Sequence, residues 1–342
     1  MPTATIHEVA KEAGVSIATV SYVLNGSRRV SEETRQRVLE ATHRLGYRPN
    51  ITARNLQASE TRLLGYSWRP SPPDQFNPIL DRFLQATAEA AERHGYRILT
   101  FPTGTIDEEA TLYEDLIRVG QVDGFVLSNT NLDDVRIRRL MDLGFRFVAF
   151  GRSNPSLDFP WVDIDGTEGI RLVMQHLIEM GHQRIGCLAW PEASLTGHYR
   201  LAGYREALES HGLPLDGGWI ARCENTHDEA YDMAGRLLKL PAERRPTAIV
   251  TMSDIMATGA INAAWDAELQ PGRDVAVTGF DDAPIARFLR PSLTSLHQPL
   301  GEVGERLVTM LVDLCQGRPV PEPHVILSPR LVVRESSMRC TP

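Results

Sequence analysis

The sequence predicts a small all-α helix-turn-helix head followed by an α/β body of two parallel-sheet subdomains. Three short segments with helical apolar periodicity fill the first 48 residues, and a serine that can cap a helix precedes the second and the third. From Leu63 onward, apolar strands alternate with amphipathic helices, which is typical of parallel sheets covered by helices. This alternation completes one half near residue 160 and then restarts.

These patterns set the expected domain boundaries. The head spans 1–48, a hinge helix and linker span 49–61, and the body spans 62–342. Within the body, the first half covers about 62–160 and the second about 161–293, and the segment LTSLHQP near 293–299 crosses back between them. Two α/β halves joined in this way can close on a ligand between them.

The composition is that of an ordinary globular chain, with 42% hydrophobic and 23% charged residues. No run of eighteen apolar residues predicts a membrane span, and the N-terminus lacks the pattern of a secretory signal. The four cysteines have no metal-ligand or disulfide-framework spacing. We therefore expect a cytoplasmic protein without a metal or another cofactor.

The charge distribution is uneven along the chain. The net charge is −8, but residues 1–60 carry eight Lys and Arg residues against six acids, so the remainder carries −10. A mildly basic head on an acidic body is typical of a polyanion-binding module attached to a ligand-binding body. A chance fluctuation of charge explains the same numbers equally well.

The head begins with a capping box. Thr5 and Glu8 are spaced to cap a first helix over residues 6–13, and Gly14 can end it in the left-handed conformation. Ser16 can then cap a second helix, and Ser31 a third that ends at Gly46. A short turn containing glycine between two short helices is typical of a helix-turn-helix motif, with a generic helical bundle as the alternative.

The second helix has two different faces. Its apolar side chains Val20, Val23 and Leu24 are expected to face the core. In a helix-turn-helix motif the opposite face enters the major groove of DNA. We predict base contacts from Ile17, Ala18 and Tyr22, and phosphate contacts from the short polar side chains of Thr5, Ser16, Thr19, Ser21 and Asn25.

A further short helix is expected after Pro49. Asn50 can cap it, and a helix of about two turns is marginal alone in water, so it needs a partner such as its own copy and DNA. Ala53 and Leu56 share one face, and Arg54 can meet a phosphate. An apolar side chain such as Leu56 can be inserted between base steps from the minor groove.

The segments TIHEVAKEAGVSIATVSYVLNG, VSEETRQRVLEATHRLGYRPN and ARNL resemble the LacI/GalR (lac repressor) family of sugar-responsive transcription regulators. The resemblance implies a body like that of periplasmic binding proteins. It also implies that Ile17, Ala18 and Tyr22 choose the operator and that Leu56 is the intercalating leucine of the hinge helix. Many members have Arg where this chain has Tyr22, so no operator sequence is transferred.

The body carries polar and aromatic residues where its strands end, which is where open parallel sheets bind ligands. Carboxylates and arginine can hydrogen-bond sugar hydroxyls, and aromatic rings can stack on the apolar face of a pyranose. A single Asp at such a position can equally be a helix cap or lie in a solvated loop. The predicted effector site comprises Phe76, Asn77, Arg152, Asp163, Asp165, Trp190, Arg200, Asp254 and Asp281.

Three of these positions also match the family resemblance: Arg200 in RLAGY, Asp254 in SDIMATGA and Asp281 in GFDD. The function predicted is that of a homodimeric repressor of carbohydrate-utilisation genes that a sugar or glucoside releases from operator DNA. A sugar-binding transport protein and an α/β enzyme that uses the carboxylates are the alternatives. The sequence contains no G-x-S-x-G, P-loop, zinc or dinucleotide-binding motif, so no enzymatic activity is expected.

Overall fold

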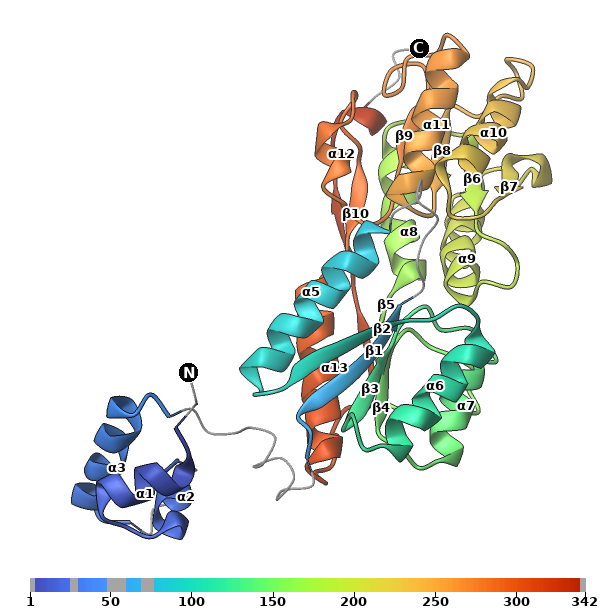
Figure 1. Ribbon diagram of the computed structural model, residues 1–342. Helices are drawn as coiled ribbons and strands as arrows, with labels where there is room; N and C mark the ends of the chain where they lie inside the picture. Colours follow the sequence, from blue (N-terminus) through green and yellow to red (C-terminus); the bar gives the residue numbers. More distant parts are fainter. Residues whose placement is uncertain (1–3, 25–29, 48–59, 69–76, 339–342) are drawn as a thin grey trace. The chain divides into compact units, whose positions relative to one another are not determined.

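The computed structural model describes residues 4–24, 30–47, 60–68 and 77–338 (Figure 1). The chain divides into two compact units, Met1–Arg62 and Leu63–Pro342. Among the helices of the described ranges, none has both the length and the apolar character needed to cross a bilayer.

The first unit is built from three helices, α1 (Ile6–Ala13), α2 (Ile17–Leu24) and α3 (Glu32–Arg44). Their core is small and fully apolar. It consists of Val9, Ala10, Ala13, Val20, Val23, Val38 and Ala41. The three helices and their inward residues agree with the sequence prediction for the head.

The predicted caps are present in the first unit. The backbone N–H of Glu8 donates to the Thr5 hydroxyl at 3.4 Å, and the backbone N–H of Thr5 donates to the Glu8 carboxylate at 2.7 Å. Gly14 ends α1 with φ of +65°, and the hydroxyls of Ser16 and Ser31 accept from Thr19 N–H and Thr34 N–H at the starts of α2 and α3. Each cap satisfies backbone groups that the helix itself leaves unpaired.

The second unit contains two lobes, each with its own parallel sheet. The first lobe has a six-stranded sheet in the order β11-β5-β4-β3-β1-β2. Its strands are β1 (Leu63–Trp68), β2 (Arg97–Pro102), β3 (Gly124–Leu127), β4 (Phe147–Phe150), β5 (Trp161–Ile164) and β11 (His324–Leu327). Helices α5 (Pro78–Arg93) and α13 (Leu300–Cys315) cover one face, and α6 (Ile106–Arg118) and α7 (Val135–Asp142) cover the other (Figure 1).

The second lobe has a four-stranded parallel sheet in the order β7-β6-β8-β9. Its strands are β6 (Ile185–Ala189), β7 (Ile220–Arg222), β8 (Ala248–Thr251) and β9 (Ala276–Thr278). Helix α8 (Gly166–Glu179) packs beside α9 (Leu195–Ser210), and α10 (His227–Leu238) packs beside α11 (Asp254–Asp266). A short helix, α12 (Ile285–Phe288), follows β9, and 3₁₀ turns lie at Gly217–Trp219 and Glu335–Ser337.

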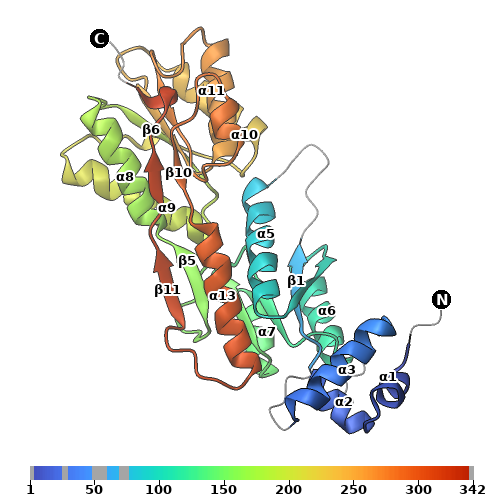
Figure 2. The same cartoon turned by 90° about the vertical axis from the view of Figure 1, so that its left-hand side faces the viewer.

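The chain passes between the lobes three times. It leaves the first lobe after β5, returns through β10 (Ser295–His297) into α13, and leaves again after β11 through β12 (Arg330–Val332). Strands β10 and β12 pair antiparallel in the region between the two sheets (Figure 2). The expected crossing near 293–299 is therefore present, and the further passage through β12 was not predicted.

The boundary expected near residue 160 lies too early. Strand β5 pairs with β4 and β11, so Trp161–Ile164 completes the first sheet, and the second lobe begins with α8. The sequence did not reveal this strand because it is only four residues long and carries a charged residue, Asp163. Residues 300–327 belong to the first lobe, because α13 and β11 pack there after the chain has crossed back.

Candidate functional site

The exposed face of α2 is apolar and uncharged, which is unusual for a surface helix. Ile17 is 40% and Tyr22 49% exposed, and Ala18 is exposed between them, whereas Val20 and Val23 are buried. Large apolar side chains held outward beside small ones form a shape-specific contact surface. The structure thus places the three predicted base-contacting residues together on one face.

Some of the short polar side chains of the head form hydrogen bonds with neighbouring residues of the head. The Thr5 hydroxyl lies 3.0 Å from the Glu8 carboxylate within the capping box, and the hydroxyls of Ser16 and Thr19 lie 2.9 Å apart. Ser16 is exposed, whereas Thr19 and Ser21 are half-buried. Five of the predicted positions in this region lie outside the described residues, namely Asn25, Asn50, Ala53, Arg54 and Leu56.

A cavity of about 140 Å³ lies in the second unit where the carboxyl ends of both sheets meet. Its lining comes from the start of α5, from the ends of β4 and β5, from the loops after β3, β4, β6, β7, β9 and β10, and from α9. The residues are Asn77, Ile79, Leu80, Asn129, Thr130, Phe150, Gly151, Asp163, Ile164, Trp190, Thr196, Arg200, Asn225, Asp281 and Gln298. This position is the one that open parallel sheets use for ligands.

Arg200 is the central cation of the cavity. Its guanidinium lies between two aromatic rings, 3.5 Å from the centroid of Phe280 and 4.7 Å from that of Trp190, and its Nη1 donates to the Met252 carbonyl. Its Nε is buried and has no hydrogen-bond partner among the residues that the structure describes. Burial lowers the pKa of Arg200 to about 10, against the opposing effect of Asp281 and other carboxylates, so it stays charged at neutral pH.

Asp281 is the second-lobe carboxylate of the cavity. It accepts a hydrogen bond of 2.7 Å from Gln298 Nε2, and its backbone has φ of +133°, a conformation rare for a residue with a side chain. Burial raises the pKa of Asp281 to about 7, although Arg200 and Gln298 favour the ionised form. The strained backbone aims the carboxylate into the cavity.

Asp163 is the first-lobe carboxylate of the cavity. Its Oδ2 accepts a 2.7 Å hydrogen bond from Arg152 Nε, and its Oδ1 accepts one of 2.8 Å from the backbone of Ile164. Burial raises its pKa, although Arg152 opposes the shift. Arg152 itself stacks 3.7 Å from the ring centroid of Tyr199, so it supports Asp163 and does not line the cavity.

Two other predicted aspartates do not line the cavity. Asp165 caps α8, with its side chain accepting from the backbone of Glu168 at 2.9 Å. Asp254 is fully buried behind the cavity, where its carboxylate accepts from Ala283 N–H at 2.7 Å and from the Ser295 hydroxyl at 2.5 Å. It holds the loop that carries Asp281. The sequence predicted Asp254 as an effector-binding residue, but it is not among the residues that line the cavity.

The comparisons with known proteins agree over nearly the whole chain. The model "Bacterial regulatory proteins, lacI family" matches residues 5–50, and the model "Periplasmic binding protein-like domain" matches residues 174–337. The HTH-type transcriptional repressor CytR of Escherichia coli K12 is 33% identical over 335 residues, covering 98% of this chain and 96% of that protein. The chain belongs to the lacI family.

Two solved structures extend this similarity to three dimensions. The complex of the transcriptional regulator CelR with cellobiose is 30% identical, with a TM-score of 0.74, and the alignment covers 97% of this chain and 99% of that one. The lac repressor dimer bound to operator and to the anti-inducer ONPF is 25% identical, with a TM-score of 0.82 and coverage of 98% and 100%. The head of this lacI-family protein is therefore a DNA-binding helix-turn-helix domain of a transcriptional regulator.

The cavity lining includes residues that the sequence predicted and others that it did not. Asn77, Asp163, Trp190, Arg200 and Asp281 were predicted and line the cavity, while Phe76 lies outside the described residues. The missed polar residues each lie in α9 or follow a strand end, a signal that the sequence does carry. They are Asn129, Thr130, Thr196, Asn225 and Gln298.

Proposed function

We propose that this lacI-family protein is a cytoplasmic, homodimeric repressor of carbohydrate-utilisation genes that a sugar or glucoside releases from operator DNA. The exposed face of α2, with Ile17, Ala18 and Tyr22, contacts bases in this proposal. Four residues of the 50–58 segment also contact DNA in this proposal: Asn50, Ala53, Arg54 and Leu56. The lac repressor structure, a dimer on operator DNA, supports the dimeric state and the DNA partner.

The observation that carries the effector proposal is the polar lining of the cavity. Carboxylate acceptors from the two lobes, Asp163 and Asp281, flank the charged donor Arg200, whose Nε has no partner among the described residues. Trp190 and Phe150 add aromatic surface to the same lining. A neutral ligand with several hydroxyls matches this alternation of donors, acceptors and apolar faces. The CelR–cellobiose complex, 30% identical, supports the same ligand class.

The carboxylates favour binding over catalysis. Asp163 is fixed by Arg152 and Asp281 by Gln298, so each already accepts hydrogen bonds that orient it. A transport-type binding protein has no use for the DNA-binding head, which argues against that alternative. A ligand that contacts both lobes shifts the equilibrium between lobe orientations, and such a shift can alter DNA binding through the dimer.

The proposal is tested with the full-length protein in two steps. A random-oligonucleotide selection identifies an operator, and a thermal-shift screen of cellobiose, D-ribose, D-glucose and other mono- and oligosaccharides identifies ligands. We expect at least one sugar to raise the melting temperature by several degrees, as mass action requires of a ligand specific to the native state, and to weaken operator binding at least tenfold.

Each outcome addresses a different part of the proposal. If no duplex is selected, the regulator proposal fails. If no sugar stabilises the protein, the effector class is wrong, and a sugar that strengthens operator binding contradicts release. Chromatography of the sugar after incubation with the protein distinguishes binding from turnover, and conversion of the sugar would support the enzymatic alternative.

A further inference from the structure

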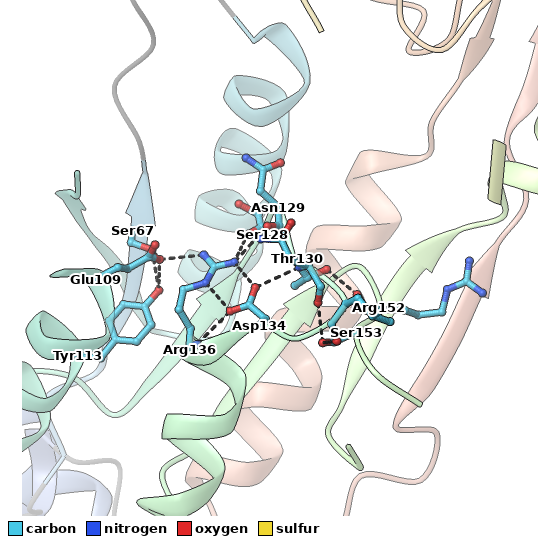
Figure 3. Close-up of polar contacts among 12 residues, drawn as sticks. Ser67, Glu109, Tyr113, Ser128, Asn129, Thr130, Asp134, Arg136, Arg152 and Ser153 are labelled. Atoms are coloured by element: carbon cyan, nitrogen blue, oxygen red, sulfur yellow. Dashed lines mark hydrogen bonds and ion pairs between the residues drawn. The ribbon is translucent and has the colours of Figure 1, made fainter. Parts of the chain in front are cut away.

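A cluster of buried charges lies in the first lobe next to the cavity but outside its lining (Figure 3). Arg136 is 3% exposed, and its two acidic partners, Glu109 and Asp134, are each 1% exposed. Arg136 Nη1 lies 2.9 Å from Glu109, and its Nε and Nη2 bind the two oxygens of Asp134 at 2.9 and 2.7 Å. The cluster joins α6 to the start of α7.

The same guanidinium also holds the loop after β3. Its Nη2 donates to the carbonyl oxygens of Ser128 at 3.0 Å and Asn129 at 3.2 Å. Asn129 lines the cavity and has φ of +51°, a left-handed conformation that, among residues with a side chain, asparagine and aspartate adopt most readily. Arg136 therefore fixes an uncommon backbone conformation in a residue whose side chain lines the cavity.

Further hydrogen bonds connect this loop to the neighbouring loop after β4. Thr130 Oγ1 donates to the Arg152 carbonyl at 2.8 Å, and Ser153 Oγ donates to the Asn131 carbonyl at 2.7 Å (Figure 3). Asp134 in turn accepts from Asn131 N–H at 3.2 Å. Because Arg152 binds Asp163, the two first-lobe loops that reach the cavity are tied together and anchored at Arg136.

The opposite side of the cluster does not reach the cavity. The hydroxyls of Ser67 and Tyr113 both donate to Glu109, and these two hydroxyls lie 2.6 Å apart. Within the described lining, neither Ser67 nor Tyr113 contributes to the cavity. Tyr113 therefore shares the buried cluster with Arg136 but lacks its bonds to the loop, which makes it a matched control.

The fold alone does not account for this cluster. Desolvating an arginine and two carboxylates costs several kcal/mol per ion, and well-packed apolar residues often stabilise a core equally well. A guanidinium can donate to two backbone carbonyl oxygens at once and so fix their positions, which apolar residues cannot do. Resting on the proposed function, we propose that Arg136 is a positioning residue for effector binding, which holds the loop 128–134 so that Asn129 and Thr130 meet the ligand.

The test compares Arg136→Lys with Tyr113→Phe in the full-length protein. The lysine variant keeps the positive charge but cannot bind Asp134 and both carbonyls at once. Hydrogen exchange of the sugar-free protein reports loop 128–134, and calorimetric titration with cellobiose reports the cavity. We expect Arg136→Lys to accelerate exchange in 128–134 at least tenfold and to weaken cellobiose binding at least tenfold. Tyr113→Phe should change either quantity by less than about twofold, even where it lowers the melting temperature.

The outcomes separate this inference from the proposed function. Unchanged exchange in 128–134, or equal loosening of this loop by both variants, overturns the positioning role. If wild type does not bind cellobiose, that sugar is excluded as the effector, and the exchange measurement still decides the role of Arg136. Should Arg136→Lys fail to fold, Asp134→Asn replaces it, since it weakens the bidentate pair and the Asn131 contact, and exchange that stays slow in 128–134 then contradicts the inference.

Discussion

Arg200 and Asp281 are placed by different physical means. Arg200 needs no opposing carboxylate in direct contact, because two aromatic rings hold its guanidinium and a carbonyl accepts from it. Asp281 instead depends on a strained backbone and on Gln298. The positions of both residues were predictable, since Asp281 follows a strand end and Arg200 lies in the helix that follows another strand. Their partners were not, because Phe280 meets Arg200 and Gln298 meets Asp281 only in the tertiary fold.

Replacing Asp281 should separate effector binding from DNA binding. Asp281→Ala removes an acceptor in the cavity, and a hydrogen bond to a charged group contributes about 1.5–3 kcal/mol, which corresponds to a loss of about tenfold or more in sugar affinity. The head lies in the other unit, so operator affinity without sugar should be unchanged within about twofold. Electrophoretic mobility shifts with and without the sugar measure operator affinity and the release of operator DNA by the sugar. Normal release of DNA from this variant would exclude Asp281 from the effector site.

The raised pKa of Asp281 also predicts how stability depends on pH. Burial gives the folded state a pKa of about 7, above the value of about 3.9 expected for an unfolded aspartate. The folded protein therefore binds more protons between these values, and this contribution is full below about pH 4 and is lost as the pH rises through 7. The free energy of unfolding of wild type relative to Asp281→Asn should fall from pH 5 to 7.5, by at most about 1.4 kcal/mol per pH unit.

Urea denaturation at several pH values measures this difference. Asp142→Asn, which removes an exposed carboxylate of α7, is the control. A difference between wild type and Asp281→Asn that does not vary with pH would show that Asp281 is ionised throughout this range.

Substitution of Tyr22 tests whether this side chain of the head contacts DNA bases. Its ring is exposed on the same face of α2 as Ile17, where it can reach base edges in the major groove. Tyr22→Arg introduces a bidentate donor for guanine, worth about 1–3 kcal/mol of discrimination at one base pair. Parallel oligonucleotide selections with both proteins should therefore differ at one position in each half-site. Identical selected sequences would show that Tyr22 faces away from the bases.

Helices and strands differed in how well the sequence predicted them. In the head, the starts of α1 and α3 and the end of α1 were predicted correctly, because Thr5, Gly14 and Ser31 mark them through local hydrogen bonds and backbone conformation. Helix α3 ends at Arg44, two residues before the predicted end at Gly46. Strands β5 and β11 were not predicted, since a four-residue strand is specified by the neighbours with which it pairs. These neighbours lie far away in the sequence, as the register of Trp161 with His324 shows.

Substitution of Gly14 measures how much the end of α1 contributes to the stability of the head. It has φ of +65°, and a Cβ atom built there meets no atom within 4 Å, so Gly14→Ala carries a conformational cost alone. We expect a loss of about 1 kcal/mol in the stability of the head, and a smaller loss for Gly14→Asn, which tolerates this conformation better. Hydrogen exchange over residues 6–24 of the full-length protein measures both, and equal effects of the two substitutions would contradict this account.

At the scale of the whole body, one aspartate joins the segments that pass between the lobes. The carboxylate of Asp282 accepts from Arg334 at 2.5 Å and lies 3.0 Å from His297, so it links the loop after β9 to the passages through β12 and β10. Its backbone carbonyl accepts from Arg82 of α5, in the first lobe, at 3.2 Å. Adjacent aspartates of one loop thus differ in role, with Asp281 facing the cavity and Asp282 facing the segments that pass between the lobes.

Removing the charge of Asp282 should destabilise the body much more than removing a surface ion pair. The Asp282 side chain is 4% and that of Arg334 13% exposed, and breaking a buried pair typically costs about 3–5 kcal/mol. Asp282→Asn keeps the shape and suits the φ of +47°, so we expect a loss of about 2–4 kcal/mol at pH 7. Arg318→Gln, which breaks a pair between an exposed arginine and the half-buried Asp313, should cost about 1 kcal/mol or less.

The pH dependence of this loss identifies its cause. Burial opposes the ionisation of Asp282, but the bonds from Arg334 and His297 outweigh it and lower its pKa in the folded protein. Its stabilising contribution is therefore present above the unfolded pKa of about 3.9 and is lost as the pH falls through the lower folded value. Urea denaturation should show the gap between wild type and Asp282→Asn shrinking below about pH 4. A gap that persists undiminished in acid would mean that Asp282 acts through packing and not through its charge.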